Sequence, residues 1–530
     1  MQTFQVIVVG AGPVGLALAL DLGQRGVNTL LVDRLAEPSH LPKMERVNPR
    51  TMEHFRRLGI AASIRSAGFP ARLPMDVFVT TTLADPPLVH HPQPSVQTLV
   101  ERGAGRNDGS MPAEPYQLIS QYTLEPLLRA QVQLQGAVTT LFGWQLAGFT
   151  DHGDRVTAEL TGPDGSTRVV EAAYLVGCDG GSSPVRKALG VHLRGEAHLM
   201  SLTQALIHAP DLYERIRTGR GRHYHFADEH HSFLIVQDDT KHFTLHTVVD
   251  EPDDVTARFE ALVGFPVDYV VEHAAPWTMR SMVAESYGRG RVFLAGDAAH
   301  LMNPAAGLGM NTGIGDAIDI GWKLNAVLAG WAPPRLLTTY ESERRPVAIA
   351  NTAYSRARFD ARMVWRSAVS TATVRSAAGR AHIAELADEN EAQAGSMEGV
   401  ELGYTYAASA QQAGIHRPYT AVASVGARLP HVWAEGGTAF QDIISQGVFT
   451  VVSVGGDDDA AAAIGAPFVA AGIPVEQLHV PSDAARRVWG ADYVVVRPDL
   501  HIVWRGDEPD AGLGSVARAS IGAGSESRYG

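Results

Sequence analysis

The chain of 530 residues contains a single cysteine, Cys178. One cysteine excludes an intrachain disulfide and leaves no set of thiolates that could hold a metal ion. No uninterrupted apolar run is long enough to span a bilayer. The apolar N-terminus lacks a basic flank, and glycines interrupt it, so a secretory signal is not expected. These absences favour a cytoplasmic protein with no metal site and no membrane partner.

Positive charge is also scarce. Lys and Arg total 44 against 57 Asp and Glu, which gives a net charge of −13. That balance disfavours nucleic acid as the main partner. With 45% hydrophobic and 19% charged residues, the composition is that of a globular protein. The length is too great for one core and predicts about three domains. Small molecules are therefore the expected partners.

Glycines near the N-terminus form a pattern typical of dinucleotide binding. The β-branched run 4–9 predicts a strand, the segment GAGPVG from Gly10 to Gly15 a tight turn, and the apolar spacing after it a helix. A second predicted strand, 27–32, ends at Asp33, whose carboxylate can accept both ribose hydroxyls of an adenine dinucleotide. A pyrophosphate could rest on the helix N-terminus beside Gly12. The alternative is a tight turn of another α/β protein.

Another glycine-and-aspartate turn lies in the block 290–311, and in chain order it is the last of three. The apolar run 291–295 predicts a buried strand that ends in Gly296-Asp297, which would place the carboxylate at a ligand crevice. Gly307 and Gly309 then allow the backbone to approach a flat ligand. We expect a helix over 311–328, whose free N–H groups favour negative charge. This loop therefore suits an electron-rich ring.

The middle of the chain contains the second of these turns in chain order and a different sheet. A predicted strand ends at Asp179-Gly180, after a hairpin centred on Pro163-Asp164-Gly165. Asp-Gly alone is a common turn, but paired with Gly296-Asp297 it becomes specific. Residues 191–283 alternate with a period near two and predict antiparallel strands that line a substrate cavity. There we rank Tyr224 and His225 first as acid/base groups, although an exposed or satisfied histidine is the commoner case.

Several polar segments have simpler interpretations. Proline and glycine in 80–115 indicate long loops or edge strands that cover a site, with His90 and His91 on a surface loop. Glu53, Arg56 and Arg57 suit a solvated helix face. Asp319 and Lys323 have the i,i+4 spacing of an exposed pair. Lys43 precedes a helix and could reach a phosphate. The polar stretch 388–398 is expected to be a linker.

These motifs resemble a known family. The GAGPVG turn with Asp33, the segment Gly177–Arg186 and the block GDAAH…NPAAGLGMNTG resemble the three fingerprints of single-component FAD-dependent aromatic hydroxylases. The likeness is greatest to phenol and 3-(3-hydroxyphenyl)propionate hydroxylases, with polyketide-tailoring hydroxylases as close relatives. From about residue 399 the chain resembles the thioredoxin-like tail of the same enzymes. This tail lacks cysteine, so packing or dimerisation is its expected use.

The resemblance implies a role for each matching residue. Gly12, Pro13 and Val14 would hold the FAD pyrophosphate, Asp33 the adenosine ribose and Gln121 the ribityl chain. Asp297 would bond the ribityl or pyrophosphate region, and 307–311 would lie along the isoalloxazine. Asp179 and Gly180 would contact both FAD and a transient NAD(P)H. The expected cofactor residues are Gly10, Gly12, Pro13, Val14, Gly15, Asp33, Arg34, Lys43, Gln121, Asp179, Gly180, Gly296, Asp297, Pro304, Gly307, Leu308, Gly309, Met310 and Asn311.

The resemblance also implies a fold and an activity. The fold is α/β, with a Rossmann-like FAD-binding domain (1–79, 116–190 and 284–388), an inserted antiparallel-sheet substrate domain (80–115 and 191–283) and a thioredoxin-like C-terminal domain (399–530). The activity is hydroxylation of a phenolic or other electron-rich aromatic substrate with NAD(P)H and O2, through a C4a-hydroperoxyflavin.

Three alternatives remain open from the sequence. One is a polyketide- or quinone-tailoring flavin hydroxylase of the same fold. Another is a flavin dehydrogenase or reductase that inserts no oxygen. The third is a non-catalytic flavin-binding protein, because fold alone does not fix function. A homodimer is compatible with each of them.

Overall fold

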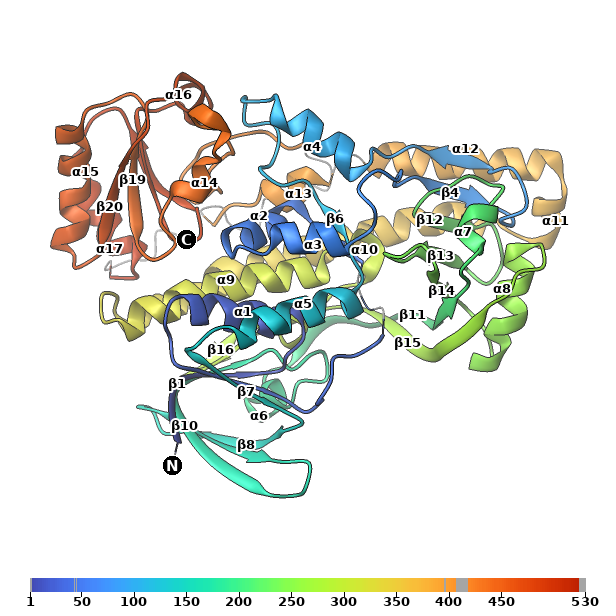
Figure 1. The fold of residues 1–530 in the computed structure, drawn as a ribbon, viewed down its shortest axis with the longest axis horizontal. Coiled ribbons are helices and arrows are strands. Elements are labelled where there is room, and N and C mark those ends of the chain that lie inside the picture. The colour runs from blue at the N-terminus through green and yellow to red at the C-terminus, as the bar shows by residue number, and fades with distance from the viewer. Residues whose placement is uncertain (1, 42, 44, 395–396, 407–417, 524–530) are drawn as a thin grey trace.

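A computed structural model describes residues 2–41, 43, 45–394, 397–406 and 418–523. In the described part of the chain, three sheets of four or more strands surround two long helices, α9 (Gly309–Leu328) and α10 (Thr338–Ser367), which run through the middle of the molecule (Figure 1). The N-terminus lies at the first sheet, whereas the last helices pack on the third. None of the helices in these ranges is both long and apolar enough to cross a membrane.

The first sheet has a parallel centre. Its strand order is β16-β17-β10-β1-β2-β7, and β17, β10, β1, β2 and β7 run parallel. The bounds are β1 Gln2–Val9, β2 Thr29–Asp33, β7 Val138–Phe142, β8 Gln145–Asp151, β9 Val156–Thr161, β10 Thr167–Gly177, β16 Gly288–Arg289 and β17 Val292–Leu294. The predicted hairpin joins β9 to β10, and the predicted N-terminal strand, turn and helix are β1, Gly10–Gly12 and α1 (Pro13–Gln24).

The second sheet is mostly antiparallel, as the alternation over 191–283 predicts. Its order is β18-β15-β11-β14-β13-β12-β4-β5, and only the pairing of β12 with β4 is parallel among the pairs described. The bounds are β4 Val77–Thr80, β5 Val89–His91, β11 Leu193–His208, β12 His223–Phe226, β13 Phe233–Val236, β14 His242–Thr247, β15 Val270–Ala284 and β18 His300–Leu301. The histidines expected on a surface loop instead belong to edge strand β5.

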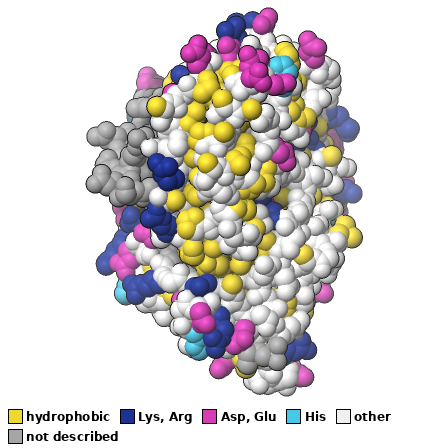
Figure 2. Space-filling model, turned by 90° about the vertical axis from the view of Figure 1, so that its left-hand side faces the viewer, with side chains coloured by type: hydrophobic (Ala, Val, Ile, Leu, Met, Phe, Trp, Pro, Cys, Tyr) yellow, Lys and Arg dark blue, Asp and Glu magenta, His cyan; other side chains and the backbone are white. Residues whose placement is uncertain are grey.

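The third sheet lies near the C-terminus and has the order β20-β19-β21-β22. Strand β19 (Phe449–Ser453) pairs in parallel with β20 (Val475–His479) and antiparallel with β21 (Tyr493–Val496), which pairs antiparallel with β22 (Ile502–Gly506). Helices α15 (Asp458–Ala470), α16 (Asp483–Trp489) and α17 (Leu513–Ser520) accompany it. On the side of the molecule where α15 lies, Figure 2 shows a broad gathering of apolar side chains, and α15 exposes 61% of Val469. The homodimer stays a prediction.

The remaining elements connect the sheets. The helices are α2 Pro49–Arg57, α3 Ala61–Ala67, α4 Val96–Ala104, α5 Gln121–Gln133, α6 Pro184–Ala188, α7 Leu212–Arg215, α8 Val255–Val263, α11 Thr371–Arg375, α12 Ala377–Ala394, α13 Glu398–Leu402 and α14 Phe440–Ile443, and the short strands are β3 Arg46–Val47 and β6 Gln117–Leu118. Helix α12 corrects the expected linker over 388–398, because the chain is helical as far as Ala394. The segment 80–115, expected to form long loops or edge strands, contains edge strand β5 and also helix α4, which was not expected.

Two predicted surface features are buried. Lys323 is fully buried, and its ammonium lies 2.7 Å from both Asp319 and Glu343. Glu53 is also fully buried and pairs with Arg428 of the C-terminal region. Both predictions of exposure were wrong for the same reason: the C-terminal region that contains the third sheet packs on α2, α9 and α10, so charged faces of these helices became interfaces. Spacing along a helix cannot distinguish a solvent face from a domain interface.

Candidate active site

A cavity of about 830 Å³ lies between the carboxyl edge of the first sheet and one face of the second. At one end it is lined by Gly10–Val14, Asp33, Asp179 and Asp297. At the other it is lined by strands β11 to β15 and by α10. Parallel strands present their carboxyl ends at one edge, which is where α/β sheets bind ligands. The three glycine-and-aspartate turns therefore meet at one cavity.

The three glycines of the first turn have different functions. A Cβ at Gly10, where φ is +105°, would lie 2.4 Å from the Cys178 carbonyl oxygen. A Cβ at Gly15 would lie 1.9 Å from the Gly10 carbonyl oxygen. Gly12 instead faces open space, because a Cβ there would meet only Glu125 Oε1, at 4.0 Å. This open cradle at the N-terminus of α1 has the shape and the N–H donors that a pyrophosphate needs.

Polar side chains surround that cradle. The Ala11 N–H donates to Asp33 Oδ2 at 2.6 Å, which fastens the turn to the end of β2. Gln121 Nε2 donates to Glu125 Oε1 at 2.5 Å, and both side chains line the cavity. Burial raises the pKa of Glu125, although the Gln121 hydrogen bond opposes this. Neither the spacing nor the composition indicated Glu125, which comes to the cradle from α5.

The second turn is held by its own aspartate. Asp179 Oδ2 accepts from the Val185 N–H at 2.9 Å, and Oδ1 accepts from the Ser183 hydroxyl. Arg186 then donates to the Ala298 carbonyl at 3.0 Å and to the Gly181 carbonyl at 3.0 Å. These bonds join the second turn to the third. Asp179 thus shapes the loop as well as lining the cavity.

The third turn presents backbone to the cavity. Pro304, Gly307, Gly309 and Met310 line it, and Gly307 has a φ of +61° that favours glycine. Asn311 does not line it. Its side chain instead accepts from the Asn48 N–H at 2.9 Å and donates to the Gly307 carbonyl at 2.7 Å. Of the residues predicted to lie along a flavin, some therefore line the cavity, and others support the loop that lines it.

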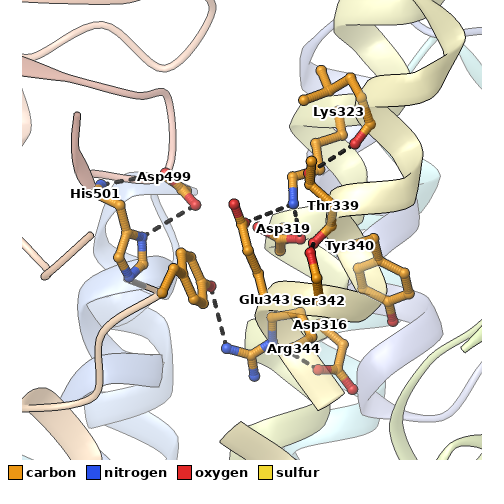
Figure 3. A network of polar contacts seen from close by, with 12 residues as sticks. Asp316, Asp319, Lys323, Thr339, Tyr340, Ser342, Glu343, Arg344, Asp499 and His501 are labelled. Carbon is orange, nitrogen blue, oxygen red and sulfur yellow. Dashed lines mark hydrogen bonds and ion pairs between the residues drawn. The ribbon is translucent and has the colours of Figure 1, made fainter. Parts of the chain in front are cut away.

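A buried ionic group supports the third turn from behind. Asp316 accepts from His300 Nε2 at 2.9 Å, from the Gly296 N–H at 3.2 Å and from Arg344 Nε at 2.8 Å. Arg344 Nη2 also donates to the Thr312 carbonyl at 2.9 Å. Figure 3 shows Asp316 and Arg344 meeting between α9 and α10. Burial by itself raises the pKa of Asp316, but the Arg344 charge and His300 hold it below its usual value.

Strand β12 decides which of the predicted acid/base groups face the cavity. Side chains alternate along a strand, and His223 and His225 line the cavity. Tyr224 points to the opposite face, where it is fully buried beside Phe78. Its hydroxyl donates to the Gly219 carbonyl at 2.7 Å and accepts from the Gly221 N–H at 2.9 Å. Tyr224 is thus a core residue outside the cavity lining, and this position does not support the acid/base role predicted for it.

His223 forms a pair that the sequence did not indicate. Its Nε2 lies 2.7 Å from Glu45 Oε1, and both side chains line the cavity. Arg222 Nη2 donates to the other carboxylate oxygen of Glu45 at 3.3 Å. Burial opposes ionisation of Glu45, but His223 and Arg222 lower its pKa to about 2. Glu45 is therefore a carboxylate that can hold His223 in one tautomer and orientation.

Most of the expected cofactor residues share the cavity. Those that line it are Gly10, Gly12, Pro13, Val14, Asp33, Arg34, Lys43, Gln121, Asp179, Gly180, Asp297, Pro304, Gly307, Gly309 and Met310. Gly15, Gly296, Leu308 and Asn311 do not line it; Gly15 and Gly296 permit close packing, and Leu308 packs in a small apolar cluster with Tyr354. The sequence missed Glu45, Glu125, Arg362 and Arg366, which line the cavity from other segments.

Comparisons with known proteins agree with this geometry. Residues 3–355 match a family described as FAD binding domain, and residues 423–524 match one described as aromatic-ring hydroxylase, C-terminal. The FAD-dependent monooxygenase apdD of Emericella nidulans is 33% identical over 95% of this chain and 87% of its own length. Aklavinone 12-hydroxylase RdmE of Streptomyces purpurascens is 32% identical over 96% of each chain.

Solved structures give the same result. The rebeccamycin biosynthetic enzyme RebC with reduced flavin superposes with a TM-score of 0.87 at 32% identity, covering 98% of this chain and 99% of its own. A ternary complex of aklavinone-11 hydroxylase with FAD and aklavinone has a TM-score of 0.81 at 28% identity, with 98% and 99% covered. This chain therefore belongs to the FAD-dependent aromatic-ring hydroxylases, which are flavoprotein monooxygenases. Its cofactor is FAD, for which the open cradle at Gly12 is shaped.

Proposed function

We propose that this enzyme hydroxylates a phenolic polycyclic substrate of the polyketide kind, with O2 as oxidant and NAD(P)H as reductant. The balanced reaction converts substrate, O2, NAD(P)H and a proton into hydroxylated substrate, NAD(P)+ and water. The observation that supports this most is one continuous cavity from the Gly12 cradle to the second sheet. Bound FAD would accept the hydride and supply one activated oxygen atom. Relatives that act on aklavinone support the substrate class.

The chain's own residues would bind the cofactor and keep water out. Ala11–Val14 would hold the pyrophosphate through N–H groups at the start of α1, beside Asp33. Gly307, Gly309 and Met310 would face the flavin ring, and the N-terminus of α9 would favour negative charge on it. The apolar lining from Trp277, Met279 and Phe233 would exclude water from the reacting atoms.

We assign the role of proton acceptor to His223, oriented by Glu45. Oxygen transfer to a ring needs an electron-rich phenolate, so a base within reach of the phenol is required. The Glu45 carboxylate would fix one ring nitrogen of His223 and leave the other to accept the proton. His225 also lines the cavity, but burial and the charges of Arg362 and Arg366 hold its pKa well below the usual value. We therefore propose that His225 contacts the substrate and does not transfer the proton.

The domain roles follow from the sheets. We propose that the first sheet is the core of a Rossmann-like FAD-binding domain and the second that of an inserted substrate domain. The third sheet, with one parallel pair followed by an antiparallel hairpin, supports the thioredoxin-like assignment of 399–530. The boundaries given above remain part of this proposal.

Labelled oxygen tests the reaction. FAD-loaded enzyme is supplied with NADPH or NADH, ¹⁸O2 and a panel of tricyclic and tetracyclic phenols. We expect substrate-stimulated NAD(P)H oxidation and a product that contains one labelled oxygen atom. Consumption of NAD(P)H with a product that lacks the label would instead identify a flavin reductase or dehydrogenase. Protein that takes up no FAD would contradict both.

A further inference from the structure

One end of the cavity is formed by one face of α10. Phe359, Arg362, Met363 and Arg366 all line the cavity, at spacings of three and four residues. Such spacing places them along one helix face. Arg366 is only 4% exposed, so a guanidinium is buried at the wall of the substrate region. His225 and His231 line the cavity beside it.

The Arg366 guanidinium is incompletely satisfied within the described ranges of the chain. Nη2 donates to the Ser232 carbonyl at 3.2 Å and to His225 Nδ1 at 3.4 Å. Nη1 is buried and has no hydrogen-bond partner among those residues. A buried cation that lacks a counterion is costly, so a side chain in this state indicates a missing anionic partner.

The nearby carboxylate does not fill that position. Asp228 raises the pKa of Arg366, but its carboxylate is already bound by Arg258 and by the Ser232 N–H, the latter at 2.9 Å. Burial and the neighbouring Arg362 together lower the pKa of Arg366 to about 9. Two cationic side chains and two histidines thus face the same part of the cavity.

We propose that Arg366, with Arg362 on the same helix face, forms an oxyanion-binding subsite that selects aromatic substrates carrying a carboxylate. This inference rests on the proposed function, because it specifies the substrate of the same site. The unpartnered Nη1 would donate to one carboxylate oxygen, and a charge-assisted hydrogen bond of this kind is roughly twice as strong as a neutral one. The ring attached to the carboxylate would extend from there toward Gly307 and Gly309.

Binding of matched probes tests the subsite without turnover. FAD-loaded protein is titrated with anthraquinone-2-carboxylate and with anthraquinone-2-carboxamide, and the flavin absorption is followed. We expect the carboxylate to bind at least about tenfold more tightly than the amide. In Arg366→Met that preference should disappear, whereas Arg375→Met, which removes an exposed arginine outside the cavity, should keep it.

A stability measurement separates loss of binding from loss of folding. Arg366→Met removes a buried cation whose partner is absent, so the free protein should melt at the same temperature as the wild type or higher. Equal affinities for the two probes, or no binding of the carboxylate at millimolar concentration, would overturn the proposal. So would an Arg366→Met enzyme that keeps the preference but loses reduction by NADPH, because the anion would then be a phosphate. Failure of oxygen insertion, by contrast, would refute the reaction and leave these binding results intact.

Discussion

At the scale of single residues, neighbours in sequence have opposite functions. Tyr224 is a core residue whose hydroxyl forms hydrogen bonds with the backbone, whereas His223 and His225 on either side of it line the cavity. The same contrast separates Gly12, which faces open space, from Gly10 and Gly15, which face carbonyl oxygens. The residue type identifies candidates for a functional role, but the direction in which the side chain points decides which of them can contact a ligand.

A chromophoric phenol can test the Glu45 and His223 pair. The probe is 1,2-dihydroxyanthraquinone, whose absorption moves to longer wavelength when a hydroxyl ionises. We expect the bound probe to ionise at lower pH in the wild type than in His223→Phe, because His223 accepts its proton. Glu45→Gln should give an intermediate result, since the histidine remains but loses its orientation.

The control for this experiment is an equivalent pair outside the cavity. His192 Nδ1 lies 3.1 Å from Glu285, and both are at the surface. His192→Phe should leave the titration of the probe unchanged. If His223→Phe also leaves it unchanged, His223 is not the proton acceptor.

At the scale of elements, α9 connects the loop that would face the flavin with the packed interior behind it. Its N-terminus faces the cavity, Gly313 allows contact with the Gly296 turn, and Asp316 bonds to that turn from one helical turn further on. A Cβ at Gly313 would lie 2.9 Å from Gly296 Cα. The shape of the flavin loop therefore depends on helix packing as much as on its own glycines.

Removing Arg344 should loosen that loop. Arg344→Met leaves Asp316 buried without its main counterion, and breaking a buried pair in this way costs about 3–5 kcal/mol. We expect a lower free energy of unfolding and weaker FAD retention. Arg356→Met, on the same helix, removes solvent-accessible ion pairs with Asp360 and Glu196 and should cost about 1 kcal/mol or less for each.

The effect of Arg344→Met should also depend on pH. In the wild type the pKa of Asp316 is below its unfolded value, so its ionisation stabilises the fold above the unfolded pKa and loses that effect as pH falls through the folded pKa. Without Arg344, burial favours the protonated acid instead. The deficit of the variant, measured by denaturant unfolding, should thus be largest near pH 7 and smaller near pH 4. A deficit that is independent of pH would contradict the assigned partner.

At the scale of the whole molecule, the region of the third sheet packs tightly on α9 and α10. Trp322 of α9 belongs to the same apolar cluster as Phe449 of β19, with ring centroids 6.1 Å apart. Arg497 donates to Glu343 at 2.8 Å, and Figure 3 shows Glu343 on α10 close to Lys323 and Asp319 of α9. Burial opposes ionisation of Glu343, but Arg497 and Lys323 lower its pKa to about 2.

We expect the C-terminal region and the FAD site to unfold together. Arg497→Met leaves Glu343, Asp319 and Asp499 with too little positive charge and should cost about 3–5 kcal/mol. In a titration with guanidinium chloride as denaturant, the midpoint of flavin release should fall together with the midpoint of the change in Trp fluorescence. Arg487→Met, at an exposed position of α16, should change neither midpoint. Flavin release that is insensitive to Arg497→Met would show that the third sheet is an independent appendage.

The sequence by itself determined the three glycine-and-aspartate turns, because each requires a backbone shape or a close approach that few other residues permit. It also determined the alternating strands, although it did not reveal which face of β12 would meet the ligand. Only the tertiary structure brought Glu45 to His223 and Arg366 to His225, since these partners lie 178 and 141 residues apart. It also decided that Asp319 and Lys323 are buried, because helical spacing fixes which side chains share a face but not what covers that face.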